Sequence, residues 1–132
     1  ALDYALQYMS EREAFGRTID QFQALRHRLV DLYSDMLLCK QFNYATVAQM
    51  EKGAYVVKEA TISKLKSTKM ADEVIYNCLQ FLGGYGYIED YPMARLSRDS
   101  RLGPIGGGTS EILREILAKI IVDKKEYKKR MA

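Results

Sequence analysis

The 132-residue sequence is poor in proline, cysteine and histidine, and each shortage excludes a class of protein. Its two prolines and its clustered glycines favour helices over a turn-rich β fold. Cys39 and Cys78 form neither a disulfide framework nor a metal-ligand spacing, and a single histidine excludes a histidine-rich zinc or iron site. We therefore expect buried free thiols and no bound metal.

A large excess of charge is also missing. Twenty Lys and Arg against 17 Asp and Glu leave a net charge of +3, and 48% of the residues are hydrophobic. This composition excludes a disordered chain and suits one packed domain. There is no signal peptide, and no apolar run approaches the ~18 residues of a membrane span. We expect an intracellular protein with no nucleic-acid partner and no membrane insertion.

Glycine and proline are absent from two long segments, between Gly16 and Gly53 and between Gly53 and Gly83. These gaps predict two long helices, near 20–52 and 55–83, that run antiparallel and are joined at Gly53. The first of them carries one apolar stripe at helical spacing, formed by Phe22, Leu25, Leu29, Leu32, Met36 and Cys39. The sequence therefore predicts an all-α fold, an up-and-down four-helix bundle with a short extra helix.

Shorter helices are expected at 1–13, from Pro92 toward Arg98 and from Thr109 to about Val122. The segment after Gly83 and the segment before Thr109 are expected to be glycine-rich loops. The last residues are highly charged and are expected to be a solvated tail. We divide the chain into a domain at 1–124 and a tail at 125–132.

Three segments contain more than a helical core requires. Arg12 stands beside a helix stop at Phe15-Gly16, and its planar guanidinium suits phosphate oxygens. Gln80-Phe81-Leu82-Gly83-Gly84-Tyr85-Gly86 has three glycines that let a flat ligand approach the backbone. The third segment runs from Gly103 to Glu111 and offers an N-cap at Thr109 or Ser110, with three consecutive glycines before it.

The order of these motifs resembles one family. Arg-x-x-Phe-Gly, Gln-x-x-Gly-Gly-x-Gly-Tyr, Arg98-Asp99 and Gly-Thr-Ser-Glu-Ile follow one another as in the C-terminal helical domain of acyl-CoA dehydrogenases, over about residues 1–124. Members are three-domain flavoproteins, so the resemblance implies that this chain is one domain of a larger enzyme. The implied reaction is α,β-dehydrogenation of a fatty or branched acyl-CoA thioester.

The resemblance assigns roles to residues in each segment. One group matches positions that contact the FAD of a neighbouring subunit: Arg12, Phe15, Gln23, Gln80, Phe81, Leu82, Gly83 and Gly84. A second group, Thr109, Ser110 and Glu111, matches the segment that contacts the FAD held mainly by the same subunit. Gly107 and Gly108 match the place where the acyl thioester lies.

The sequence departs from the commonest pattern of this family at Gly107, where many members have the glutamate that acts as the base. Glycine cannot accept a proton, so no catalytic residue is expected in this chain. The isovaleryl- and long-chain-like branches place the base on the preceding helix, and we expect it upstream of Ala1. Two alternatives remain open: a family member without dehydrogenase activity, silent or monooxygenase-like, and a helical module that mediates only assembly.

The resemblance also implies partners. These are FAD as cofactor, an acyl-CoA substrate, electron-transfer flavoprotein as acceptor, and a homodimer or homotetramer. The implied location is cytoplasmic in a bacterium and the mitochondrial matrix in a eukaryote. Because the matched contacts are divided between two flavins, we expect the 132 residues alone neither to hold FAD tightly nor to oxidise acyl-CoA.

Overall fold

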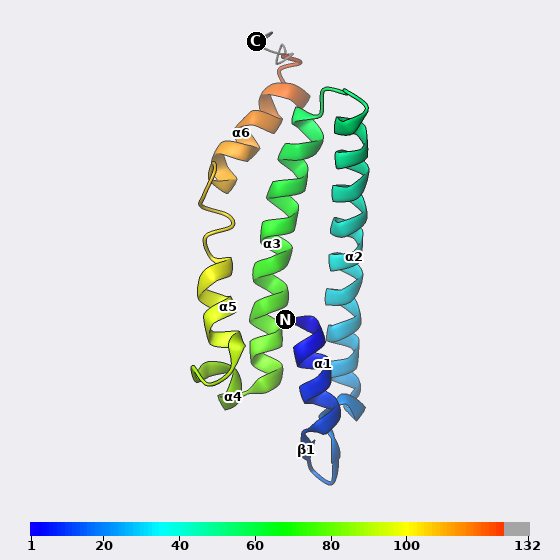
Figure 1. The fold of residues 1–132 in the computed structure, drawn as a ribbon, viewed down its shortest axis with the longest axis vertical. Coiled ribbons are helices and arrows are strands. Elements are labelled where there is room, and N and C mark those ends of the chain that lie inside the picture. Colours follow the sequence, from blue (N-terminus) through cyan, green and yellow to red (C-terminus); the bar gives the residue numbers. More distant parts are fainter. Residues whose placement is uncertain (126–132) are drawn as a thin grey trace.

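The computed structural model describes residues 1–125 and shows an all-α domain of several packed helices, as the sequence predicts (Figure 1). The central helix α3 has α1 and α2 on one side and α5 and α6 on the other. Most of the expected charged tail, residues 126–132, lies outside the described residues. The elements are α1 (Leu2–Glu11), β1 (Glu13–Ala14), β2 (Arg17–Thr18), a 3₁₀ turn (Ile19–Gln21), α2 (Gln23–Glu51), α3 (Val57–Leu82), α4 (Gly84–Tyr87), α5 (Pro92–Ser100) and α6 (Ser110–Ile121).

The two long helices predicted from the glycine-free gaps are confirmed, with slightly tighter bounds. At the end of α2, Gly53 adopts φ +79°, which glycine reaches without steric cost. Its N–H donates to the carbonyl of Met50, and the Ala54 N–H donates to that of Gln49. This pair of bonds is the Schellman arrangement, and it satisfies carbonyls that a helix end leaves without partners.

The hydrophobic core lies where α1, α2, α3 and α5 meet. Leu32 on α2 is 2% exposed, and its stripe neighbours Phe22, Leu25, Leu29 and Met36 pack half-buried around the core. On α3, burial raises the pKa of the Cys78 thiol to about 11, so it stays protonated and inert. Cys39 is free and half-buried. The predicted stripe is therefore the core face of α2 as far as Met36, and Cys39 lines a groove beyond it.

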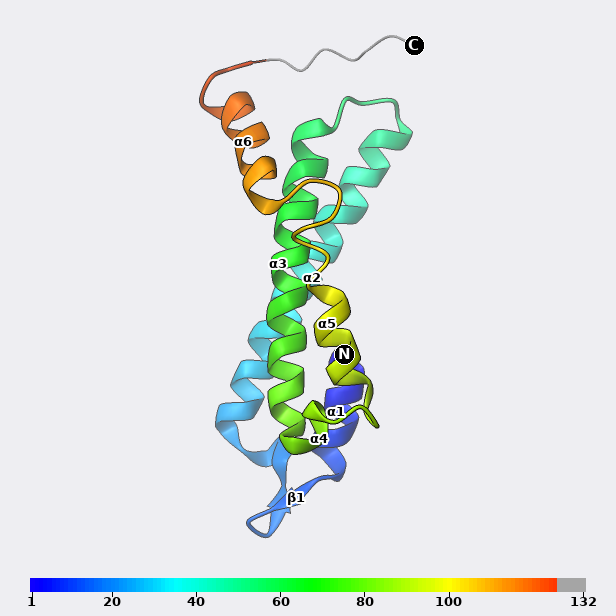
Figure 2. The same cartoon turned by 90° about the vertical axis from the view of Figure 1, so that its left-hand side faces the viewer.

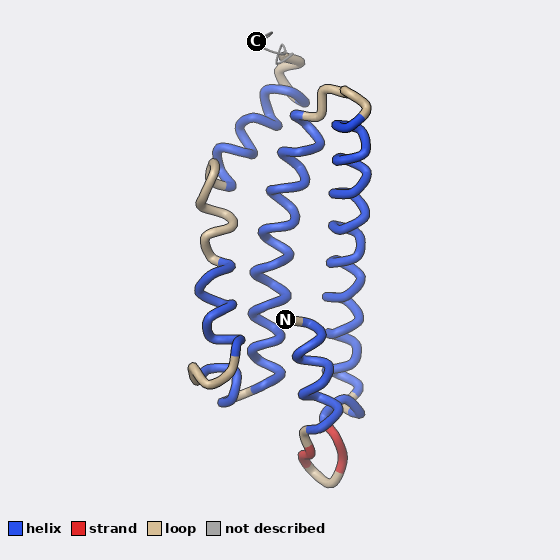
Figure 3. The backbone as a smooth tube through the Cα atoms, in the orientation of Figure 1, coloured by secondary structure: helices blue, strands red, loops and turns tan. Residues whose placement is uncertain are grey.

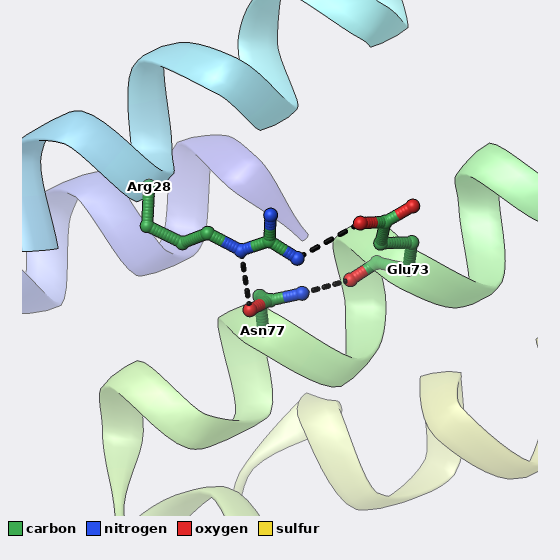
Figure 4. A network of polar contacts seen from close by, with 3 residues as sticks. All are labelled: Arg28, Glu73 and Asn77. Carbon is green, nitrogen blue, oxygen red and sulfur yellow. Dashed lines mark hydrogen bonds and ion pairs between the residues drawn. The ribbon is translucent and has the colours of Figure 1, made fainter.

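A polar network fixes α2 against α3 (Figure 4). Arg28 donates through Nε to Asn77 Oδ1 at 2.9 Å and through Nη2 to Glu73 Oε1 at 2.8 Å. The amide of Asn77 donates to the Glu73 carbonyl at 2.7 Å. Farther along the pair, Asn43 on α2 donates to Ser67 on α3 at 3.1 Å. These bonds set the register that brings the start of α2 beside the end of α3.

Two local elements differ from the predictions. Helix α1 ends at Glu11, and residues 13–18 form a small antiparallel hairpin, whose two strands are drawn in red in Figure 3. Its two-residue loop, Phe15-Gly16, has φ +53° and +78°, the signs that a type I′ turn requires. The segment after Gly83, predicted to be a loop, forms the one-turn helix α4. Two-residue strands and a four-residue helix carry no periodicity that a sequence pattern would reveal.

None of the helices within residues 1–125 combines the length and apolar character needed to span a bilayer.

Candidate functional site: two polar regions along α3

The residues singled out in the sequence gather in two regions. The first, here called the hairpin end, comprises Arg12, Phe15, Gln23 and Gln80–Gly84 at the lower end of the bundle in Figure 1. The second comprises the glycine loop, Gly103–Gly108, and the start of α6 at Thr109–Glu111. Lys64 contacts the glycine loop, and Gln80 follows it on α3 by 16 residues, or about 24 Å of helix. One domain therefore presents two separate regions.

At the hairpin end, Arg12 lies over the ring of Tyr85, with its guanidinium carbon 5.8 Å from the ring centroid. That ring also meets Tyr8 and Tyr91 edge to face, at centroid distances of 6.2 and 5.2 Å. Burial raises the pKa of Tyr8, so its hydroxyl remains protonated. A cavity of about 340 Å³ is lined by this group together with Tyr4, Gln7 and Glu11. Tyr85 belongs to the glycine-containing segment named from the sequence, whereas Tyr8 and Tyr91, which the sequence reasoning missed, pack around the ring on which Arg12 lies.

The hairpin itself carries Phe15, whose side chain is 96% exposed. Phe15 meets Phe22 edge to face, at a centroid distance of 6.2 Å, and the Arg17 guanidinium carbon lies 4.2 Å from the centroid of the same Phe22 ring. Gln23 is exposed at the first position of α2. A phenylalanine that is both exposed and held at positive φ adds nothing to the core, and such strain is typical of functional positions.

The three glycines that follow Gln80 differ in why the structure has glycine there. Gly83 adopts φ +59° to end α3, whereas a Cβ on Gly84 would meet no atom within 4 Å. A Cβ on Gly86 would lie 2.4 Å from the carbonyl oxygen of Leu79, so this glycine serves the packing of α4 on α3. The expectation that all three glycines admit a ligand is therefore wrong for Gly86, and Gly84 keeps the open space.

The side chains before these glycines are divided between surface and core. Gln80 is exposed, while Phe81 and Leu82 are 8% and 2% exposed inside the bundle. A ligand at this loop therefore has the Gln80 amide and backbone groups available. The role of Phe81 and Leu82 in FAD binding stays a prediction, restricted to their backbone atoms.

In the second region, Lys64 on α3 holds the glycine loop. Its ammonium donates to the carbonyl of Gly108 at 2.7 Å and also to the carbonyl of Gly106. Gly107 and Gly108 have φ +63° and +100°, and a Cβ on Gly107 would lie 3.5 Å from Lys64 Nζ. Figure 2 shows this loop crossing in front of α3 between α5 and α6. A distance of 3.5 Å is an ordinary contact distance, so the positive φ, and not a lack of space, is what favours glycine at 107 and 108.

Lys64 was not predicted, although the sequence holds a signal for it. It lies between Ala60 and Thr68 at helical spacing, on a stretch of α3 that also carries Ser63 and Ser67. A charged side chain on a stripe of small residues has to find polar partners, because burying a charge without them is costly. Its partners are 42 and 44 residues away in the sequence, beyond the reach of a local pattern.

At the start of α6, the N-cap is Thr109, one of the two residues predicted for it, and Ser110 is the first residue of the helix. The Thr109 hydroxyl oxygen accepts from the Ile112 N–H at 3.4 Å. The carboxylate of Glu111 accepts from its own backbone N–H and from the Thr109 hydroxyl, and Arg114 donates to it at 3.0 Å. These contacts, led by the backbone bond, lower the pKa of Glu111. An ionised carboxylate with a lowered pKa is a poor base, which agrees with its expected role as a flavin contact.

Arg98, the first residue of the Arg98-Asp99 motif, pairs with a carboxylate of the same chain. Arg98 donates from both terminal nitrogens to the carboxylate of Glu89, at 2.6 and 2.9 Å. This hydrogen bonding lowers the pKa of Glu89. Arg98 therefore braces the turn between α4 and α5. Among residues 1–125, no cluster of three or more histidine, cysteine or acidic side chains has the arrangement of a metal site.

The geometry defines a helical domain whose polar regions lie at two levels of its central helix, and comparisons with known proteins place that domain in a family. A family model described as the acyl-CoA dehydrogenase C-terminal domain matches residues 1–122. Isovaleryl-CoA dehydrogenase, mitochondrial, of Bos taurus is 36% identical over 118 residues, which are 89% of this chain and 28% of that protein. Long-chain specific acyl-CoA dehydrogenase, mitochondrial, of Sus scrofa is 34% identical, over 89% of this chain and 27% of that protein.

A solved structure gives the same result. The crystal structure of a probable acyl-CoA dehydrogenase from Mycobacterium abscessus is similar with a TM-score of 0.89 and 34% identity, over 91% of this chain and 32% of that one. The chain belongs to the acyl-CoA dehydrogenase family and corresponds to its C-terminal domain. Members of this family are FAD-binding oxidoreductases. The chain spans little more than a quarter, 28%, of the first of these relatives.

Proposed function

We propose that this chain supplies the C-terminal domain of an FAD-dependent acyl-CoA dehydrogenase that oxidises a fatty or branched acyl-CoA thioester between its α and β carbons. The observation that carries the proposal is the placement of two polar regions, one beside Arg12 and one at the capped start of α6, on a chain that the family model matches over residues 1–122. The similarity to isovaleryl-CoA and long-chain relatives supports a branched or long acyl substrate.

The residues of both regions suit FAD. Arg12 offers a guanidinium for phosphate oxygens, Gln80 offers an amide, and Gly84 has open space in front of its backbone. At the start of α6, Thr109 and Ser110 add hydroxyl groups. When bound, FAD accepts the hydride that leaves the β-carbon. Two regions about 24 Å apart cannot contact the same part of one flavin, so the proposal assigns them to two flavins in an assembly.

The base that removes the α-proton is proposed to come from outside these 132 residues. Gly107 has no side chain, and Glu111 is held ionised by the cap and by Arg114. A carboxylate with a lowered pKa binds the α-proton weakly, so Glu111 is poorly suited to this step. This chain's own contribution is to bind and orient: the glycine loop and Thr109–Glu111 are placed beside the reacting atoms, and the hairpin end beside a neighbouring flavin.

The outer face of α2 supports self-association as a homodimer or homotetramer. Besides the core stripe, α2 carries a second apolar set that is exposed, formed by Val30, Tyr33, Leu37, Tyr44 and Val47. Its members follow one another at helical spacing and find no cover within residues 1–125. Apolar surface of this kind usually marks an interface, and closed symmetric assemblies are the commonest solution.

Several further predictions belong to the same proposal. Electron-transfer flavoprotein is the proposed electron acceptor, and the proposed location is intracellular. The division into a domain at 1–124 and a tail at 125–132 also stays a prediction. Nothing in the net charge of +3 favours a nucleic-acid partner.

The proposal is tested on the FAD-bound enzyme that contains this chain. Isovaleryl-CoA and a long straight-chain acyl-CoA are added without oxygen, and flavin absorbance is followed. We expect the yellow band to bleach, and electron-transfer flavoprotein to restore it. Arg12→Gln should weaken FAD binding about tenfold, as expected when one charge-assisted contact is lost. The matched control is Arg95→Gln, at an exposed position on α5. A wild-type protein whose flavin stays oxidised with every acyl-CoA would contradict the proposal.

A further inference from the structure

The contact between Lys64 and the glycine loop has a geometric consequence for the start of α6. Lys64 is half-buried on α3, and one ammonium group donates to the carbonyls on both sides of Gly107, those of Gly106 and Gly108. Both carbonyls must therefore face α3. The Ser110 N–H also donates to the Pro104 carbonyl at 3.0 Å, which closes the loop on itself.

The direction of these carbonyls fixes the direction of two N–H groups. The peptide bonds of the described residues are trans, so each N–H points opposite to the carbonyl of the preceding residue. With the Gly106 and Gly108 carbonyls turned toward Lys64, the N–H groups of Gly107 and Thr109 point away from α3. Within residues 1–125 neither N–H has a hydrogen-bond acceptor. Lys64 therefore sets the direction of two free donors.

The glycines make such a restraint necessary. Gly107 and Gly108 lie at positive φ, and a glycine loses more conformational freedom on ordering than any other residue. Among residues 1–125, Lys64 supplies the hydrogen bonds of the two peptide groups that carry the Gly106 and Gly108 carbonyls, so without it these two groups would be freer to rotate. Lys64 supplies three donors on one charged group, which suits it to hold two carbonyls at once.

We propose that Lys64 is a positioning residue for the dehydrogenation: it orients the glycine loop so that the N–H groups of Gly107 and Thr109 face the thioester and the flavin. The inference rests on the proposed function, which places these two ligands at residues 107–111. Lys64 contacts neither ligand and acts through the two carbonyls.

The test compares Lys64→Met, Lys64→Arg and the control Lys66→Met in the FAD-bound enzyme. Lys66 lies two residues along α3 and is exposed on the groove that faces α2. Hydrogen exchange is followed by mass spectrometry in peptides covering residues 103–112. We expect exchange about tenfold faster in Lys64→Met, because losing a charge-assisted hydrogen bond changes an equilibrium by at least this factor. Peptides around Leu32 report whether the change is local.

The kinetic measurement separates positioning from stability. Lys64→Met should lower kcat/KM by about tenfold while the flavin absorbance shows that FAD is still bound. Lys64→Arg, which keeps the charge and the donors, should recover most of both the protection and the activity. Lys66→Met should match the wild type in both.

Two results would overturn the inference. Unchanged exchange at residues 103–112 in Lys64→Met would show that Lys64 does not hold the loop. Faster exchange with unchanged kcat/KM would show that its role is only structural. A wild type inactive on every acyl-CoA would overturn the proposed function and the catalytic half of this inference, and faster exchange would then still support the holding of the loop by Lys64.

Discussion

The hairpin end and the glycine loop both present backbone and polar groups to a ligand, but different contacts hold them. At the hairpin end Arg12 lies on the face of Tyr85, and Phe15 stands exposed on a two-residue turn. In the glycine loop, Lys64 on α3 donates hydrogen bonds to backbone carbonyls, and the loop ends at Thr109, the N-cap of α6. Aromatic and cation–π contacts at a surface contribute little each, whereas hydrogen bonds to a charged group contribute more. We therefore expect the glycine loop to be the more firmly fixed region.

The largest expected effect tests this difference directly. Lys64→Met should lower the free energy of unfolding by about 2–4 kcal/mol, because two bonds to a charged donor are lost. Arg12→Met should lower it by only about 0.5–1 kcal/mol, the value of an exposed cation–π contact. Urea unfolding of both variants measures the two values. Equal losses would show that the two regions are held equally firmly.

The next largest effect on the free energy of unfolding is expected at Gly86, where α4 packs closely on α3 beside the hairpin end. Gly86→Ala places a Cβ 2.4 Å from the Leu79 carbonyl oxygen, so α4 must move. We expect a loss of about 1–3 kcal/mol, as for other overpacked sites. Gly84→Ala is the control: its Cβ meets no atom within 4 Å, and its effect should stay below about 0.5 kcal/mol. A stable Gly86→Ala variant would contradict the close approach of α4 and α3.

The Thr109 cap should contribute less to the free energy of unfolding than the Lys64 contacts in the same region do. Its bond from the Ile112 N–H is long, 3.4 Å, so Thr109→Ala should cost about 0.5–1 kcal/mol, the low part of the range for N-caps. Thr109→Ser keeps the hydroxyl and should retain most of the stability. Thermal unfolding measures both. A loss as large as that of Lys64→Met would mean that the cap, and not the lysine, fixes the loop.

Phe15 is expected to lower the stability of the turn and to strengthen FAD binding. Phe15→Asn puts the residue favoured at type I′ turns onto φ +53°, and we expect a gain of about 0.5 kcal/mol after the edge contact to Phe22 is lost. In the FAD-bound enzyme the same variant should bind FAD more weakly. Urea unfolding and FAD titration together provide the check. Lower stability, or unchanged FAD affinity, would remove the functional reason for the strained turn.

The smallest effect is a pH dependence shared by the two regions. The pKa of Glu89, beside the hairpin end, and that of Glu111, at α6, both lie below the ordinary value of 4.5. A carboxyl group whose pKa is lower in the folded state than in the unfolded state stabilises the fold at pH values above its unfolded-state pKa. This contribution is lost as the pH falls through the folded-state pKa. Unfolding measured below pH 4.5 should show stability falling with acid. Glu89→Gln and Glu111→Gln should each flatten that slope, and unchanged slopes would contradict the contacts.

Part of this architecture could be predicted because its signals are local. Glycine-free gaps and one apolar stripe predicted α2 and α3, and Gly53 marked the turn between them. An N-cap at Thr109 or Ser110 was predicted from their place after the glycines, and the structure has it at Thr109. The hairpin at Phe15-Gly16 and the helix α4 were not predicted, since elements of two and four residues are too short to show a repeating pattern of apolar residues.

The sequence by itself determined the helices other than α4, the core face of α2 and the positions of the three motifs, because each depends on residues within a few turns of one another. Only the tertiary structure decided which motifs lie together. Arg12 meets Tyr85, and Lys64 meets Gly106 and Gly108, across separations of 42 residues or more. Such contacts depend on the register of α2 on α3 and on the path of the chain between α5 and α6. That register and that path result from packing the whole chain at once, and no local spacing encodes them.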